Sequence, residues 1–198
     1  MNKNIKNICV FASSSDNVDR IYYKAAYNLG VEIAKNGYNI VYGGSKLGLM
    51  GEVTYSASKN GSDITGVMPE KLYNLGINPG DCTKFILTKD MRSRKQKMDE
   101  LSDAVIALAG GFGTLEELSE MIVQKQLNYS NKPIVILNTN GYYNSLISFF
   151  NEIIKNRFAP KCAETIYYIA NTPEEALNYI NNYTQSESHY LDSKIKIN

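Results

Sequence analysis

The chain has 198 residues and is almost neutral, with 21 Lys and Arg against 20 Asp and Glu. This length suits one domain with a sizeable core, and the charge balance disfavours nucleic acid or an anionic membrane surface as a partner. Because the sequence has neither a signal-peptide core nor an apolar stretch of about 18 residues, we expect a soluble, cytoplasmic protein.

Strand-like apolar runs alternate with helix-like periodic segments along the chain. The apolar runs lie at 5–12, 38–42, 63–68, 84–87, 103–109, 133–137 and 165–170. The periodic segments lie at 18–36, 47–59, 91–101, 114–127, 142–156 and 173–182. This alternation predicts an α/β fold of the Rossmann-like, doubly wound kind, with a mostly parallel sheet of about seven strands flanked by helices.

Turn and cap signals fit this division. Gly37 follows a periodic segment as a helix C′ residue does, and Thr172 is placed to cap the last helix. The segment 70–81 is the longest stretch predicted to be irregular. Since we find no repeat or linker, we expect a single domain over residues 1–183 and a polar tail over 184–198.

The histidine and cysteine content restricts the chemistry. His189, the only histidine, lies in the polar tail, which disfavours Ser-His-Asp, Cys-His and histidine-rich metal sites. Cys9, Cys82 and Cys162 lie far apart and form no CxxC pair, so neither a disulfide framework nor a zinc site is indicated. An enzyme with this composition has to use carboxylates, Arg, Lys, Tyr or backbone donors.

A glycine-rich turn follows the most apolar strand. The run 104–109 leads directly into the sequence GGFGT at 110–114, behind which a helix is predicted. Glycines let backbone N–H groups approach a ligand closely, and a helix N-terminus favours an anion, typically a phosphate. Thr114 at the N-cap and Glu117 at N3 also fit a capping box, so the residue pattern alone leaves a purely structural role open.

Two other loops have the same position, after a strand and before a helix, at 13–15 and 43–48. In a parallel sheet such loops meet at the carboxyl edge, so we expect a nucleotide or sugar phosphate there. Neither a dinucleotide fingerprint nor a P-loop is present. Glu116 stands where the fingerprint needs its third glycine, and Leu49 stands where a P-loop has lysine.

Two carboxylates, Glu116 and Glu117, stand in the first turn of the helix behind the glycine turn. They would repel an anionic ligand unless they contact its hydroxyl groups or a developing cation. Glycosidic bond cleavage passes through an oxocarbenium-like transition state, which a carboxylate stabilises. An acid beside a phosphate loop therefore favours a ribose phosphate that loses its base.

The helix predicted at 91–101 begins with basic residues. Arg94 and Lys97 share one face with Met98 nearby, whereas Arg92 lies on another, and this pattern fits either a solvated face or an anion clamp. An arginine at the start of this helix lies beside the same crevice. There it can hold a phosphate through two hydrogen bonds or polarise a leaving base.

Two motifs together resemble a known family. The pair Arg94-Lys95 and the segment 109–117, AGGFGTLEE, are similar to the RK and PGGxGTxxE signature of the Lonely Guy (LOG) family of cytokinin riboside 5′-monophosphate phosphoribohydrolases, often labelled lysine decarboxylase-like. Further similar segments lie at 10–15, 41–45, 48–51, 102–104 and 138–143, and the resemblance spans 8–180.

The resemblance implies hydrolysis of the N-glycosidic bond of a purine nucleoside 5′-monophosphate to free base and ribose 5-phosphate, without a metal or organic cofactor. Arg94 and Glu117 take the catalytic positions. The positions implied to bind substrate are Gly44, Ser45, Met91, Lys95, Gly110, Gly111, Gly113, Thr114 and Glu116. Because family members are typically dimers with a shared pocket, a homodimer is implied, with neither nucleic acid nor a membrane as partner.

The sequence departs from the family pattern at three places. Ala109 replaces a proline, Ser45 replaces a third glycine, and Arg92 stands where many relatives have histidine. We expect none of these to abolish the chemistry, although Arg92 bears on base preference. Nothing marks Lys95 or Lys97 as a Schiff-base lysine, so the decarboxylase label has no support.

Two other classes of protein stay open. A non-catalytic nucleotide or cofactor carrier on the same fold is the main alternative, because a fold does not dictate function. A single-strand DNA-binding module is the second, and the near-zero net charge argues against it. The preferred base, adenine or N6-prenylated adenine, also stays open, because apolar pockets discriminate by only about 1–3 kcal/mol per group.

Overall fold

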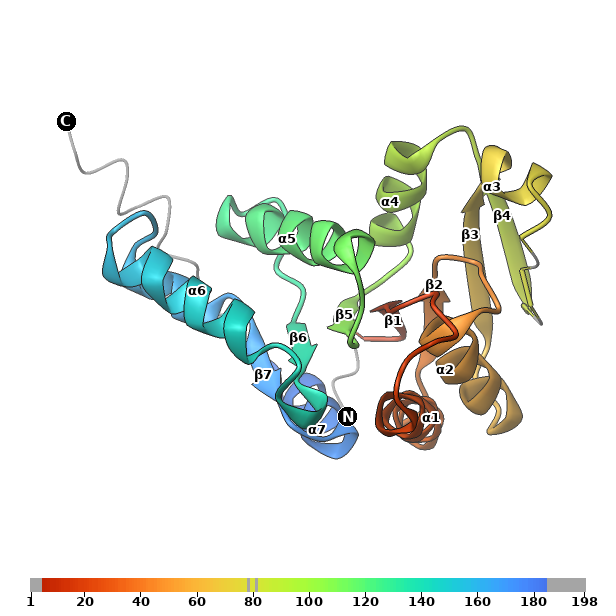
Figure 1. Ribbon diagram of the computed structural model, residues 1–198, viewed down its shortest axis with the longest axis horizontal. Coiled ribbons are helices and arrows are strands. Elements are labelled where there is room, and N and C mark those ends of the chain that lie inside the picture. Colours follow the sequence, from red (N-terminus) through yellow and green to blue (C-terminus); the bar gives the residue numbers. More distant parts are fainter. Residues whose placement is uncertain (1–4, 78, 81, 185–198) are drawn as a thin grey trace.

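The computed structural model describes residues 5–77, 79–80 and 82–184. These residues form a seven-stranded sheet between two layers of helices (Figure 1). The strands are β1 Asn7–Phe11, β2 Asn39–Tyr42, β3 Ile64–Pro69, β4 Lys84–Thr88, β5 Ala104–Ala107, β6 Ile134–Leu137 and β7 Tyr168–Ala170. Their order is β4-β3-β2-β1-β5-β6-β7 and every neighbouring pair is parallel, which confirms the predicted fold class.

The helices divide between the two faces of the sheet. They are α1 Arg20–Lys35, α2 Gly48–Lys59, α3 Glu70–Asn74, α4 Met91–Glu100, α5 Phe112–Gln126, α6 Asn144–Lys155 and α7 Pro173–Asn181, with short 3-10 turns η1 Thr139–Gly141 and η2 Lys161–Thr165. Helices α1, α2 and α7 cover one face, and α4, α5 and α6 cover the other (Figure 1). Each strand of the centre is therefore buried on both sides, as its continuous apolar sequence requires.

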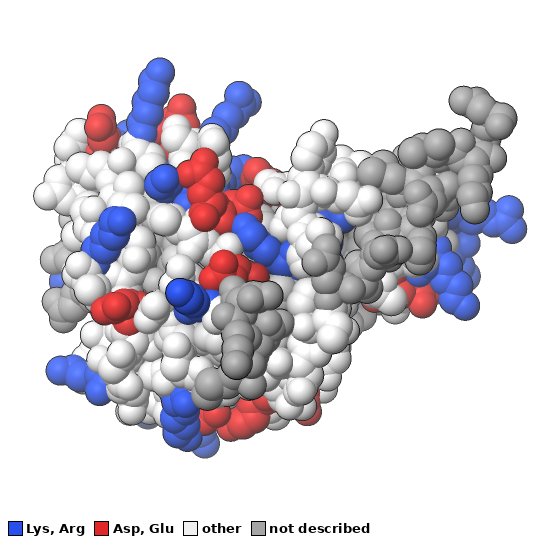
Figure 2. Space-filling view, turned by 180° about the vertical axis from the view of Figure 1, so that it is seen from behind, with Lys and Arg blue, Asp and Glu red and all other residues white. Residues whose placement is uncertain are grey.

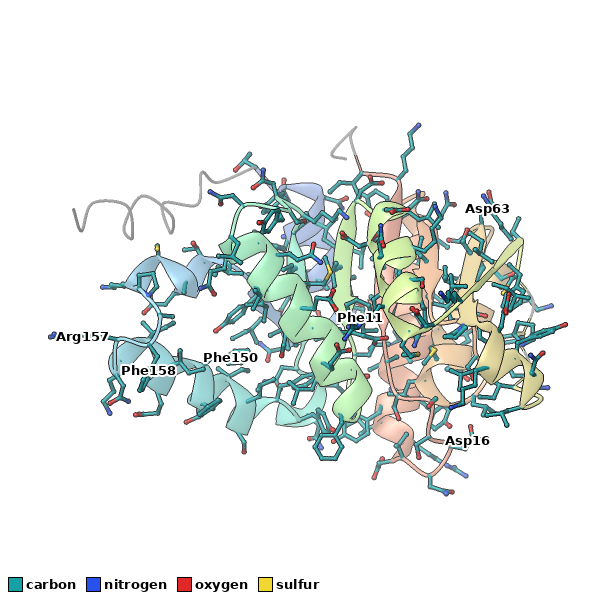
Figure 3. The ribbon with its side chains drawn as sticks, turned by 90° about the horizontal axis from the view of Figure 1, so that it is seen from above. Phe11, Asp16, Asp63, Phe150, Arg157 and Phe158 are labelled. Atoms are coloured by element: carbon teal, nitrogen blue, oxygen red, sulfur yellow. The ribbon has the colours of Figure 1, made fainter. Side chains whose placement is uncertain are left out.

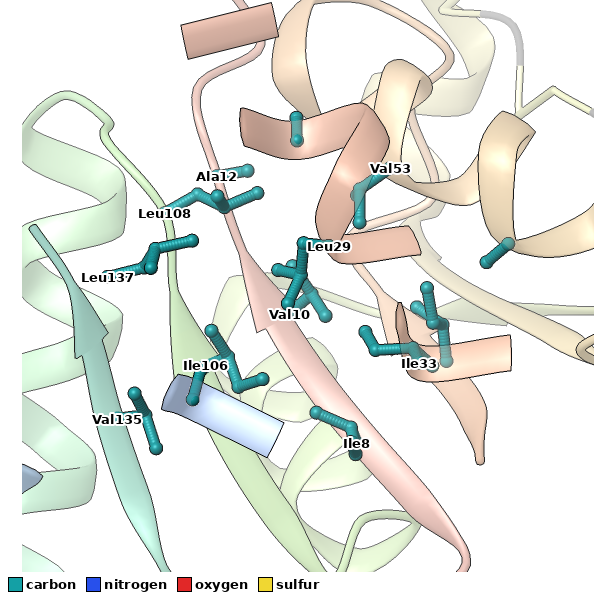
Figure 4. Close-up of a cluster of buried hydrophobic side chains, with 14 of the residues drawn as sticks. Ile8, Val10, Ala12, Leu29, Ile33, Val53, Ile106, Leu108, Val135 and Leu137 are labelled. Carbon is teal, nitrogen blue, oxygen red and sulfur yellow. The ribbon is translucent and has the colours of Figure 1, made fainter. Parts of the chain in front are cut away.

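Alternate residues of one strand enter different cores. Ile8 and Val10 of β1 pack with Leu29 and Ile33 of α1 (Figure 4). Cys9 and Phe11, the residues between and after them, pack in the second core with residues of α4, α5 and α6. Since side chains along a strand alternate between faces, four apolar residues supply both cores.

Local signals at helix ends are partly confirmed. Gly37 has the left-handed φ of +71° expected of a C′ residue, and the Thr172 hydroxyl accepts a hydrogen bond from the Glu175 N–H at 3.2 Å. The stretch 70–81 is not irregular throughout, because residues 70–74 form the short helix α3.

The predicted capping box at Thr114 is wrong. Helix α5 begins at Phe112 with Gly111 as its N-cap, so Thr114 lies inside the first turn. Its side chain is buried against Gly110, where a Cβ would collide with the Thr114 hydroxyl. The glycines let the helix start earlier than the Thr-x-x-Glu pattern predicts, and Glu117 is thereby free for another partner.

Some sequence-based predictions concern residues that the structure does not describe. Residues 185–198, with His189, are outside the described residues, and the assignment of 1–183 to one domain stays a prediction. In the described part of the chain no helix has the length and apolarity needed to cross a membrane. Cys9 and Cys162 are free thiols.

Helices α1 and α2 approach each other closely at Gly30, and this contact generates a first prediction. A Cβ at Gly30 would collide with the Ser56 hydroxyl and the Val53 carbonyl oxygen. We expect Gly30→Ala to lower the free energy of unfolding by about 1–3 kcal/mol, because the overpacked helices have to move apart. Urea unfolding followed by circular dichroism measures the change.

Gly113→Ala is the matched control. Among the described residues nothing lies within 4 Å of a Cβ at Gly113, so the better helix propensity of alanine should leave stability unchanged or raise it by up to about 1 kcal/mol. Equal effects of the two substitutions would contradict the close packing inferred at Gly30.

Candidate active site

The strand order reverses between β1 and β5, and the loops that follow these two strands meet at this point. The chain proceeds outward from β1 to β4 and then returns to start β5 on the other side of β1. The Ser13 N–H donates to the Ala109 carbonyl at 3.1 Å, and the Met50 N–H donates to the Ser13 carbonyl at 3.1 Å. The three loops predicted to converge at the carboxyl edge therefore do so, at the position where open α/β sheets bind ligands.

In the glycine turn, Gly110 is tightly packed, whereas Gly111 and Gly113 have open space beside them. Gly110 has no room for a side chain because Thr114, which is only 4% exposed, packs against it. In contrast, a Cβ at Gly111 or Gly113 would meet nothing within 4 Å among the described residues. The first N–H groups of α5 are thus approachable from outside, which is the arrangement that binds phosphate at a helix N-terminus.

A buried ion pair lies beside this turn. Arg94 of α4 places Nη2 3.1 Å from Oε1 of Glu117 on α5, and each side chain is only 8% exposed. The guanidinium occupies space that only a glycine leaves, because a Cβ at Gly43 would collide with Nη2. Its Nη1 donates to the Met91 sulfur at 3.6 Å. Met91 and Gly43 therefore fix the guanidinium of Arg94, which in turn holds the Glu117 carboxylate.

Two effects shift the pKa of Glu117 in opposite directions. Burial raises the pKa of Glu117, and the charge of Arg94 lowers it, leaving a net upward shift. Within the described part of the chain the buried Nε of Arg94 has no hydrogen-bond partner. A buried ion pair with an unused donor is costly for stability alone, so the arrangement points to a ligand or a reaction.

The neighbouring Lys95 faces a different environment. Its ammonium group forms ion pairs with Glu116 and Glu120 of α5, on the more exposed side of the two helices. Lys97, expected to share the face of Arg94, instead pairs with Glu100 at the surface. Of the predicted site residues, the structure brings Arg94, Glu117 and Met91 together, whereas Lys95 and Glu116 pair with each other.

The remaining predicted residues form the wall toward β2 and β3. Gly44 has a left-handed φ of +80° and lies close to Met68. Ser45 is 7% exposed, and its hydroxyl accepts a hydrogen bond from the Leu47 N–H at 3.2 Å. Among the described residues no group of three or more His, Cys, Asp and Glu side chains is arranged to hold a metal ion.

Sequence reasoning missed three contributors to this site. Gly43 makes room for Arg94, and the glycine doublet after the second strand was the available signal. The Tyr142 hydroxyl donates to the Gly110 carbonyl of the glycine turn, and the Tyr143 hydroxyl donates to the Leu108 carbonyl, two residues before the turn. They stand in one of the segments similar to the LOG family, but nothing in their sequence neighbourhood indicates which loop they reach.

The glycine turn at 110–114, whose approachable N–H groups suit a phosphate, is called the phosphate-ready turn below. It lies at the switch point of a parallel sheet, with a buried carboxylate and guanidinium beside it. These features define a Rossmann-like nucleotide- or sugar-phosphate-binding protein with a carboxylate placed for catalysis. Residues 50–180 match the family model described as "possible lysine decarboxylase". The chain belongs to this family and, within it, to the Lonely Guy (LOG) proteins.

Named relatives cover most of the chain. A probable cytokinin riboside 5′-monophosphate phosphoribohydrolase of Oryza sativa subsp. japonica is 38% identical over 96% of this chain and 78% of its own length. A cytokinin riboside 5′-monophosphate phosphoribohydrolase of Arabidopsis thaliana is 38% identical over 90% of this chain and 83% of its own length. Among solved structures, the molybdenum cofactor binding protein of Rippkaea orientalis matches with a TM-score of 0.69 and 25% identity, over 91% of this chain and 98% of that one.

The buried pair generates a stability prediction. Arg94→Met leaves Glu117 buried without a counter-charge, which should lower the free energy of unfolding by about 3–5 kcal/mol near neutral pH. Without Arg94 the pKa of Glu117 rises further above its unfolded value. The folded variant then retains a proton that the unfolded chain releases, so its deficit should grow as pH rises above the ordinary carboxyl range and shrink below it.

Lys97→Met tests the same helix at its surface. Lys97 and Glu100 are 40% and 46% exposed, so their separation should change stability far less than Arg94→Met does, with little dependence on pH. Denaturant unfolding at pH 5 and pH 8 compares the variants. A pH-independent deficit in Arg94→Met would contradict the charged state inferred for Glu117.

Proposed function

We propose that this protein hydrolyses the N-glycosidic bond of purine nucleoside 5′-monophosphates and releases the free base and ribose 5-phosphate. The observation that carries the proposal is the buried carboxylate of Glu117, held 3.1 Å from Arg94 beside the phosphate-ready turn. The activity for which the plant relatives are named supports the same reaction, and these relatives are 38% identical over most of this chain.

The geometry supports the following mechanism. The 5′-phosphate binds the N–H groups at the start of α5 and at Gly110, Gly111, Gly113 and Thr114, which orients the ribose toward Glu117. As the bond between C1′ and the base breaks, positive charge develops on the ribose ring. The Glu117 carboxylate stabilises this charge or orients the water that adds to C1′. The hydroxyl of that water stays on C1′, and the proton that it releases balances the one that the base takes up as it leaves.

Arg94 has two tasks in this proposal. It opposes the rise in the pKa of Glu117 that burial causes, so that the carboxylate is available in its charged form near neutral pH. Its remaining donors face the leaving purine or the phosphate. Gly44, Ser45 and Met91 form the surrounding wall, and the chain's own residues suffice for each step, without a cofactor.

A decarboxylase function does not fit the same residues. A Schiff-base lysine needs a lowered pKa so that the amine is neutral. Burial alone would lower the pKa of Lys95, but its hydrogen bonds to Glu116 and Glu120 outweigh this effect, and the pKa is raised. We therefore assign Lys95 and Glu116 to the substrate-facing rim rather than to covalent chemistry.

We also propose a homodimer that acts in the cytoplasm and shares its active site. The structure buries no residue of α6, although Ile147, Phe150 and Ile154 pack partly against the core. A groove of about 210 Å³ lies between α5 and α6 and is lined by mainly apolar side chains. Phe150 lies on the side of α6 toward α5, and Phe158 lies beyond its end (Figure 3).

A second copy is the occupant that fits this groove. Phe112, which is 92% exposed in the glycine turn itself, and Val123, which is 50% exposed on the same helix, extend the apolar surface from the groove to the active site. A partner seated there would cover both and close the pocket around the nucleotide.

The carrier alternative uses the same turn without bond cleavage. A carrier has no need of a carboxylate directed at the sugar, so removal of Glu117 should leave its binding intact or improved. For a DNA-binding module, the mixture of acidic and basic side chains on the face seen in Figure 2 gives no continuous basic track. The hydrolase proposal is the one that uses the buried pair.

Hydrolysis is tested with AMP and, separately, N6-isopentenyl-AMP, with free base and ribose 5-phosphate followed by chromatography. Glu117→Gln and Arg94→Ala should each lower kcat by about 100-fold or more, since each removes a group that acts in the transition state. Glu100→Gln, an exposed change on α4, should stay within about twofold of the wild type.

The rate ratio for the two nucleotides decides between an unmodified and an N6-prenylated adenine. Release of no base from either nucleotide by the folded wild-type protein would contradict the hydrolase proposal. Binding of the intact nucleotide in that experiment would favour the carrier.

The homodimer is tested by light scattering coupled to size-exclusion chromatography. The wild type should elute with twice the mass of one chain. Val123→Glu should yield monomers, because it buries an unpaired charge at the apolar groove. Leu75→Glu, at a residue that is 71% exposed after α3, should leave the dimer intact. A monomeric wild type at micromolar concentration would contradict the proposal.

A further inference from the structure

The turn after β6 reaches across to the glycine turn after β5. The Tyr142 hydroxyl donates to the Gly110 carbonyl at 2.7 Å, and the Tyr143 hydroxyl donates to the Leu108 carbonyl at 2.7 Å. The carbonyl between them, that of Ala109, accepts from the Ser13 N–H at 3.1 Å. Three consecutive carbonyls of the loop are therefore each held by a donor from another part of the chain.

Holding a carbonyl also orients the next N–H group. The peptide unit is planar and trans, so the N–H of residue i+1 points opposite to the carbonyl of residue i. Each bond thus directs one N–H group away from its own donor: that of Ala109 away from Tyr143, that of Gly110 away from Ser13, and that of Gly111 away from Tyr142. Within the described part of the chain, no acceptor forms a hydrogen bond with the N–H of Gly110 or Gly111.

The turn that carries the two tyrosines is itself firmly built. Asn140 and Gly141 both adopt left-handed conformations, with φ of +53° and +70°. The Asn138 side chain accepts from the Tyr143 N–H at 2.8 Å and so fixes the direction in which Tyr143 leaves the turn. This construction places both hydroxyls with little freedom to move.

The two rings contact each other, and Tyr143 is buried whereas Tyr142 is 45% exposed. Tyr142 packs edge-on against Tyr143, with ring centroids 4.9 Å apart, and against Tyr22 of α1 at 5.6 Å. Tyr143 is 5% exposed, and burial raises its pKa, so its hydroxyl stays protonated and remains a donor across the physiological range. A phenylalanine would fill the same space without the donor.

We propose that Tyr142 and Tyr143 are positioning residues that hold the Gly110 turn with its N–H groups directed at the 5′-phosphate. They set the affinity of the site for the phosphate end of the ligand and leave the cleavage of the glycosidic bond to Glu117 and Arg94. This inference rests on the proposed function, because it takes the turn as the phosphate site of that reaction.

Single hydroxyl deletions test the inference. Tyr142→Phe and Tyr143→Phe should each raise the KM for AMP, and the inhibition constant of ribose 5-phosphate, by about two- to tenfold, the effect of one hydrogen bond. Inhibition by free adenine and kcat should stay within about twofold of the wild type, since adenine does not contact the turn and the bound nucleotide still meets an unchanged Glu117 and Arg94.

Tyr22→Phe is the matched control. Its ring belongs to the same aromatic cluster, but its hydroxyl forms no hydrogen bond within the described part of the chain, so neither constant should move. Calorimetric titration of each variant with ribose 5-phosphate measures the phosphate site independently of turnover. A wild type that binds ribose 5-phosphate but releases no base would defeat the hydrolase proposal alone.

Two results would overturn the positioning role. The first is an unchanged KM and an unchanged affinity for ribose 5-phosphate in both Tyr142→Phe and Tyr143→Phe while the wild type is active. The second is a loss confined to kcat together with a lower melting temperature, which is the signature of a merely structural contribution.

Discussion

The buried ion pair between Arg94 and Glu117 is the interaction on which the site depends. A carboxylate that is 8% exposed would take up a proton if it stood alone, and Arg94 counteracts this tendency. The pair is possible only because Gly43 leaves room for the guanidinium and because α4 and α5 lie side by side over the same face of the sheet. The fold thus favours an ionised Glu117 carboxylate in a buried position, where removal of the charge from water costs free energy.

The parallel sheet explains how so neutral a chain can bind an anion. Its strand order reverses between β1 and β5, which brings their loops together at the carboxyl edge. Backbone N–H groups at the start of α5 then act as donors without any added positive charge. The net charge of +1 therefore agrees with a phosphate ligand recognised by oriented dipoles rather than by a basic surface.

The sequence predicted the sheet well because parallel strands buried on both faces need continuous apolar runs, and all seven runs contain a strand. It also predicted Arg94 and Glu117, though their contact stayed beyond pattern reasoning. The start of α5 was placed too late, because a Thr-x-x-Glu pattern does not reveal that Gly111 can serve as N-cap. The contacts of Tyr142 and Gly43 join distant segments. The glycine doublet at Gly43 indicates a close approach, but local sequence does not say which residue approaches.

Helical geometry separates the two ion pairs that link α4 and α5. Arg94 and Lys95 are consecutive in sequence, as are Glu116 and Glu117, so successive side chains point about 100° apart around each helix axis. One pair consequently turns inward and loses water, while the other turns outward and keeps it. The outer pair adds little stability because water screens it. Glu117 lies beside the glycine turn because α5 begins at that turn, and the packing of α4 against α5 supplies Arg94 to it. One contact between two helices therefore provides both the buried pair of the site and the exposed pair at its edge.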